Sequence, residues 1–130
     1  MRRRRLLLLA LLAVAGPALA APEAKKKGGG ASYLQLPSVT ATVLRANRQY
    51  GVLMVDVGID TPDPALRRRV EQSVPLLRDA FVREMAIYAP SIAPGGAPNP
   101  DRLGDQLQKA VDRILGRPGA HVLLGSILVN

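Results

Sequence analysis

The sequence predicts a small α+β domain of two layers, in which a mainly antiparallel sheet carries two helices on one face. Three observations predict it. Apolar residues alternate at period two over residues 50–59, they recur at the helical period after Pro64, and they fill residues 120–130. The predicted order is strand, strand, helix, helix, strand. Helices that return between the last two strands make those strands antiparallel if they are neighbours.

The first predicted strand covers residues 33–44, YLQLPSVTATVL. Its apolar positions change parity across Pro37 and Ser38, so we expect a bulge or bend there and an edge position for that part. The polar residues 45–49 predict a turn. The first two strands should therefore form an antiparallel hairpin.

The second predicted strand, residues 50–59, is amphipathic. One face carries Leu53, Val55, Val57 and Ile59, and the opposite face carries Met54, Asp56 and Gly58. Burial of that opposite face would raise the pKa of Asp56. We instead expect Asp56 to belong to the open, polar side of the strand.

The first predicted helix follows a tight corner, with Asp63 as N-cap and Pro64 as first helical residue. Pro75 interrupts the helix and should bend it. Its apolar stripe is Leu66, Val70, Val74, Leu77, Phe81, Met85 and Tyr88. Three arginines in the first turns are disfavoured by the helix dipole. Arg67, Arg68 and Arg69 are therefore candidate contacts for an acidic partner, and a solvated helix face is the alternative.

Residues 89–100 predict a loop rich in Pro and Gly, after which Asn99 and Pro100 repeat the capping arrangement and open a second helix. Its buried stripe is Leu103, Leu107, Ala110, Val111, Ile114 and Leu115. Residues 116–119 end the helix. The last predicted strand, residues 120–130, is apolar on both faces, which predicts a position inside the sheet or at a covered interface.

Residues 1–20 have the pattern of an export signal. Four arginines at 2–5 precede an apolar run at 6–15, and residues 18–20 form a small-x-small cleavage site. We expect cleavage after Ala20 and a periplasmic protein. The alternative is an uncleaved anchor that keeps the chain on the inner membrane.

An anchor would have to use residues 6–21, which is shorter than the roughly 20 residues of a spanning helix. Residues 21–31 then predict a linker rich in Lys and Gly, whose lysines could touch anionic lipid in an anchored chain. Residues 32–130 form the predicted domain.

The formal net charge of +8 does not describe this domain. From Ala31 onward the chain has eleven Lys and Arg against nine Asp and Glu, so most of the excess belongs to the N-terminal segment. A nucleic-acid-binding domain concentrates its charge on its own surface, and we therefore expect no nucleic-acid partner.

No residue pattern predicts catalysis. The chain has no cysteine and one histidine, His121, so the pattern predicts no metal site. None of its serines stands in a G-x-S-x-G elbow, and the glycine run at 28–30 is in the linker. We expect a non-enzymatic protein without catalytic residues, cofactor or metal.

The segments at 33–37, 53–57, 63–66, 74–80 and 123–130, in that order, resemble the periplasmic domain of the FliL family of flagellar basal-body-associated proteins. The capped helix that runs into VPLLRDA is the most specific part. The resemblance covers nearly all of the chain after the leader. It implies a stomatin-like domain that forms homo-oligomers, associates with the flagellar stator and supports motility.

Two features depart from that family. Its members usually carry a full transmembrane helix, whereas this leader is short, and the segment at 89–100 is unusually rich in Pro and Gly. Two functions are therefore expected as alternatives. One is a FliL-like accessory of the basal body and stator, and the other is a soluble periplasmic binding or adaptor module for another envelope complex.

Overall fold

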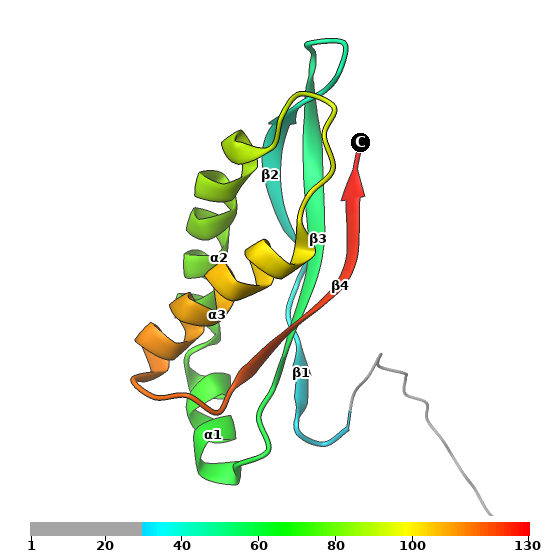
Figure 1. Ribbon diagram of the computed structural model, residues 1–130. Coiled ribbons are helices and arrows are strands. Elements are labelled where there is room, and N and C mark those ends of the chain that lie inside the picture. The colour runs from blue at the N-terminus through cyan, green and yellow to red at the C-terminus, as the bar shows by residue number, and fades with distance from the viewer. Residues whose placement is uncertain (1–29) are drawn as a thin grey trace, which may run out of the picture.

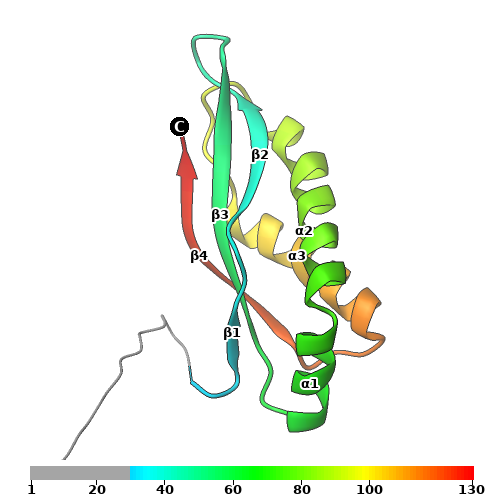
Figure 2. The same cartoon turned by 180° about the vertical axis from the view of Figure 1, so that it is seen from behind.

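The computed structural model describes residues 30–130, which fold into one four-stranded antiparallel sheet covered on one face by helices (Figures 1 and 2). The elements are β1 (Tyr33–Gln35), β2 (Val39–Leu44), β3 (Tyr50–Asp60), α1 (Pro64–Gln72), α2 (Val74–Tyr88), the short 3₁₀ turn η1 (Ala89–Ser91), α3 (Pro100–Leu115) and β4 (His121–Val129). The α+β prediction is confirmed. The predicted leader and most of the linker lie outside the described residues.

The central strand is β3, the longest of the four. It pairs along one edge with β2 near its start and with β1 near its end, and along the other edge with β4. The strand predicted over residues 33–44 is two strands, separated at Pro37 and Ser38, where the parity of apolar residues changes. Both parts still pair antiparallel with β3, so the predicted hairpin is present.

The last strand is at the edge of the sheet, which corrects one of the two positions predicted for it. β4 pairs only with β3, because β1 and β2 together occupy the opposite edge of that strand. One face of β4 packs under the helices through Val122, Leu124 and Ile127, and the other face belongs to the open side of the sheet. An apolar residue pattern on both faces of β4 therefore does not require a hydrogen-bonded strand along both of its edges.

A β-bulge interrupts the pairing of β3 with β4. Val55 lies opposite Ile127 and Val57 opposite Leu124, so Gly125 and Ser126 together face the single residue Asp56. A bulge of this kind bends its strand and increases the local twist. It also leaves Gly125 beside Asp56, where a Cβ would lie 3.1 Å from the Asp56 Cβ.

The predicted first helix is two helices. α1 ends at Gln72 and α2 begins at Val74, with Ser73 between them and Pro75 in the first turn of α2. Proline has no N–H to donate to the carbonyl four residues earlier, that of Glu71, and the helix breaks at Ser73, between these two residues. Both predicted N-caps are confirmed, because Asp63 accepts from the amide of Ala65 and Asn99 from that of Arg102.

The core lies between the sheet and the helices, as the apolar stripes predict. Leu53, Val55, Val57 and Ile59 of β3 are fully buried against Phe81, Met85 and the inner side of α3. The predicted stripes are buried except for Val74 and Ile114, which are half-buried at the margin. This one-sided packing leaves the second face of the sheet without a covering layer in residues 30–130, as Figure 2 shows.

Candidate interaction surface

Part of the open face of the sheet carries exposed apolar side chains. Tyr50, Val52 and Met54 alternate along β3 on this face, and Leu128 of β4 lies directly opposite Met54. Leu128 is 58% exposed and Tyr50 78%. We call these four residues the sheet patch. Contiguous exposed apolar surface of this kind marks protein contacts more often than solvent-facing structure.

The outer edge of β4 carries unpaired backbone groups beside the sheet patch. Val52 and Asn130 exchange both backbone hydrogen bonds, at 3.1 and 2.9 Å. Bonded and non-bonded pairs alternate in an antiparallel ladder, so Leu128 bonds to β3, whereas Ile127 and Val129 direct their N–H and C=O groups outward. Such an edge is a template for pairing with a further strand.

The beginning of β4 is protected from such pairing by a side chain of α3. The Gln108 amide nitrogen donates to the carbonyl of Ala120 at 2.7 Å, and its oxygen accepts from the N–H of Val122 at 2.8 Å. The side chain thus imitates a neighbouring strand over one residue pair. Only the second half of β4 is left as a free edge.

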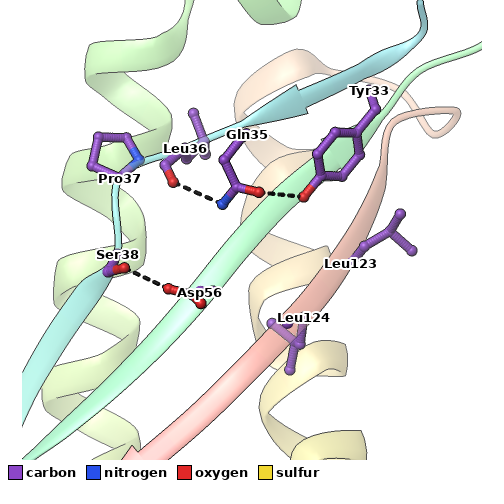
Figure 3. Close-up of a pocket in the computed structure, with 9 residues that line it drawn as sticks. Tyr33, Gln35, Leu36, Pro37, Ser38, Asp56, Leu123 and Leu124 are labelled. Carbon is purple, nitrogen blue, oxygen red and sulfur yellow. Dashed lines mark hydrogen bonds between the residues drawn. The ribbon is translucent and has the colours of Figure 1, made fainter. Parts of the chain in front are cut away.

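A depression of about 540 Å³ lies on the same open face, where β1 gives way to β2 (Figure 3). It is lined by Tyr33, Gln35, Leu36, Pro37, Ser38, Asp56, Leu123, Leu124 and Gly125. The ring of Tyr33 covers β3 at Gly58, where a Cβ would lie 2.0 Å from the tyrosine oxygen. The ring can take this position because residue 58 has no side chain.

Hydrogen bonds within the depression fix its polar side chains. Tyr33 donates its hydroxyl proton to Gln35 Oε1 at 2.7 Å, and Gln35 Nε2 donates to the carbonyls of Leu36 and Val57 at 3.1 and 3.2 Å. The hydroxyl of Ser38 donates to Asp56 Oδ1 at 2.5 Å. Asp56 is half-buried, on the open face as predicted, but it forms part of this depression.

The surroundings of Tyr33, including the charge of Asp56, change the pKa of its phenol. The pKa of Tyr33 is raised above its ordinary value, first by partial burial of the phenol and then by the negative charge of Asp56. Both causes disfavour a phenolate. Tyr33 therefore keeps its proton, which it donates to Gln35, over the physiological pH range.

The three predicted partner contacts on α1 do not form one uniform surface. Arg67 folds back on the corner before the helix, and its guanidinium donates to the carbonyls of Thr61 and Pro62 at 3.2 and 3.1 Å. Arg68 and Arg69 are exposed and remain available as contacts. Near them Asp63 pairs with Arg117 at 2.5 Å, which lowers the pKa of Asp63.

The histidine does not complete a catalytic triad. His121 is the register partner of Asp60, and Asp60 accepts a hydrogen bond from the hydroxyl of Ser32 at 2.5 Å. A triad needs the imidazole between the hydroxyl and the carboxylate, whereas here the serine bonds directly to the aspartate. Within residues 30–130, no group of three or more His, Cys, Asp or Glu side chains could hold a metal ion.

Sequence comparisons do not assign the chain to a family. No family model and no curated protein matches it. Among the helices that the structure describes, none is long and apolar enough to cross a membrane.

Sequence reasoning missed the residues that shape these surfaces. The packing of Tyr33 over Gly58, the position of Gly125 beside Asp56 and the bridge from Gln108 to β4 each join different elements of the fold. The one available signal was the apolar run at 120–130, which pointed to a covered surface at β4.

Proposed function

We propose that this chain is a non-enzymatic interaction protein of the bacterial cell envelope, which self-associates and contacts a larger complex. Its resemblance to the FliL family supports an accessory role at the flagellar basal body and stator. The observation that carries the proposal is the free edge of β4 beside the sheet patch. Unpaired backbone groups and exposed apolar side chains meet there without any charged residue in residues 121–130.

Self-pairing of β4 satisfies both features of this edge. An antiparallel arrangement of two copies, with a two-fold axis at Leu128, places Ile127 of one copy opposite Val129 of the other. Their outward N–H and C=O groups then bond to each other. The same axis brings the two Leu128 side chains together on the open face, so each covers part of the other's sheet patch.

The test is the oligomeric state of the chain, expressed with its own leader and measured by light scattering at several concentrations. We expect the wild type to associate as concentration rises. Leu128→Lys should be monomeric, because a charge on each side of the axis repels. Leu76→Lys is the matched control, since Leu76 is 62% exposed on α2, on the helical side of the domain.

Val129→Pro tests the edge without changing charge. The N–H of Val129 points outward, so proline removes a donor of the free edge and leaves the ladder to β3 intact. This variant should also be monomeric. A wild type that stays monomeric at every concentration, or a Leu128→Lys variant that associates like the wild type, would contradict the self-association.

The flagellar part of the proposal has a separate test in the source organism. Deletion of the gene should reduce swimming while leaving assembled filaments visible by electron microscopy. Wild type and Leu76→Lys should restore swimming, and Leu128→Lys should not. Normal swimming after deletion removes the flagellar role and leaves the oligomer measurement unaffected.

The depression beside Asp56 favours a second candidate, a soluble binding or adaptor module of the periplasm. A domain of this kind would bind its ligand as a monomer. It predicts that the depression binds a ligand equally well in wild type and Leu128→Lys. If binding instead requires the associated form, the accessory function is favoured.

A further inference from the structure

Every side-chain O–H and N–H group that faces the depression at Asp56 already donates a hydrogen bond. The hydroxyl of Tyr33 donates to Gln35, both amide hydrogens of Gln35 go to backbone carbonyls, and the hydroxyl of Ser38 goes to Asp56. The orientation of the Gln35 amide is fixed, because a flipped amide would place its oxygen against two carbonyl oxygens. The lining side chains therefore offer acceptors and no free side-chain donor.

The acceptor with a full charge is Asp56. Within residues 30–130 no Lys or Arg forms an ion pair with it, and no Lys or Arg lines the depression. Its carboxylate is half-buried beside Leu123 and Leu124, and one hydroxyl is the only side chain that bonds to it among the described residues. A half-desolvated carboxylate of this kind gains most from a donor that carries positive charge.

The shape of the depression suits a cationic group on an aliphatic stem. The Ser38–Asp56 pair lies on one side of it and the Tyr33 ring on another, and Leu123 and Leu124 flank it along β4 (Figure 3). Gly125 keeps the space beside Asp56 free of a side chain. A charged head could reach Asp56 and the Tyr33 oxygen while its methylene groups contact the leucines.

We propose that this depression binds the guanidinium of an arginine or the ammonium of a lysine that projects from a protein docked on the open sheet face. Leu123 is exposed on that face and lines the depression, so a surface that covers the sheet patch also reaches Asp56. This contact is one that the proposed accessory role would require. The inference rests on that proposed function only in taking the cation from a docked protein.

The probe is a blocked Gly-Arg-Gly peptide, titrated into ¹⁵N-labelled chain and followed by the amide signals of Gln35, Ser38, Asp56 and Gly125. The lysine peptide should behave similarly. The citrulline peptide keeps the shape and removes the charge, and we expect it to bind about fivefold to tenfold more weakly. Binding of the arginine peptide should weaken as salt is raised.

Asp56→Asn should remove this preference for arginine over citrulline. Asp79→Asn is the matched control, because it makes the same change of charge on α2, on the other side of the molecule from the open face. Amide spectra of each variant report whether the fold is retained.

Equal binding of the arginine and citrulline peptides by the wild type overturns the proposal, and this comparison needs no variant. An Asp56→Asn variant that folds and keeps the preference also overturns it. Butylguanidinium tests the source of the cation. If it binds as tightly as the peptide, the cation site stands and a free small molecule becomes its source. The oligomeric state of Leu128→Lys is independent of all these results, so failure here is distinct from failure of the proposed function.

Discussion

The bridge from Gln108 to β4 makes a prediction that joins stability to self-association. Gln108→Ala removes the amide that donates to the carbonyl of Ala120 and accepts from the N–H of Val122. In residues 30–130 no other side chain bonds to the beginning of the β4 edge. The third bond of Gln108, to Asp112 on the surface of α3, should matter little. The variant should therefore lose stability and lengthen the free edge.

The size of the loss follows from the two backbone contacts. Each hydrogen bond contributes about 1 kcal/mol net, and Ala120 is fully buried, so its carbonyl is left without this donor. The better helix propensity of alanine returns only a few tenths of a kcal/mol. We expect a loss of about 2 kcal/mol in the free energy of unfolding. For a domain of this length that lowers the melting temperature by roughly 8–16 °C.

Denaturant unfolding and hydrogen exchange together measure the effect. The amide of Val122 should exchange much faster in Gln108→Ala, while the amide of Leu128, which bonds to β3, should change only with global stability. Gln106→Ala is the control, because the side chain of Gln106 bonds to Glu84 of α2 and not to β4. A Val122 amide that exchanges as slowly in Gln108→Ala as in the control would refute the reasoning.

Three further predictions concern charge and processing. Asp56→Asn should lower the pKa of Tyr33 toward its ordinary value without reaching it, because burial is the larger cause and remains. NMR titration of the tyrosine ring signals measures this pKa, and an unchanged pKa contradicts the prediction. The pKa of Asp63 is lowered first by its hydrogen bond with Arg117. This ion pair therefore stabilises the fold above the ordinary carboxyl pKa, and the stabilisation is lost as the pH falls through the pKa of Asp63 in the folded protein. Arg117→Ala should therefore melt below wild type at neutral pH, and the two melting temperatures should converge below about pH 4; curves that stay parallel contradict the linkage. Intact mass of the product expressed with its own leader should begin at Ala21 in the periplasmic fraction, and a full-length product in the inner membrane would show that the leader is retained as an anchor.

Local chemistry made much of the fold predictable from the sequence. The alternation of Leu53, Val55 and Val57 depends only on the period of a strand, and it named the buried face correctly. The caps at Asp63 and Asn99 depend on side chains bonding to amides two or three residues away. Strand alternation and helix caps depend on residues that are close in the sequence, and these local patterns were sufficient to predict the α+β class.

The sites were much less predictable, because the depression joins distant segments and the contacts of Arg67 depend on how the chain turns at the corner before α1. Asp56 was recognised as an open-face residue, but its position in a depression depends on residues along both edges of β3. Tyr33 and Ser38 lie along one edge, and the bulge of β4 lies along the other. Arg67 is part of a predicted contact, yet the structure gives its guanidinium two carbonyl partners at the preceding corner. Neither arrangement has a signal in local spacing.

The sequence by itself determined most of the buried residues, where α1 and α3 begin and that β4 is apolar on both faces. Only the tertiary structure decided that β4 is an edge strand, that its first residues are covered by Gln108 and that its second half is free. The physical reason is that strand order depends on which backbone groups find partners across the sheet. Once β1 and β2 share one edge of β3, a single edge remains for β4, and its outer side has no strand to pair with in residues 30–130.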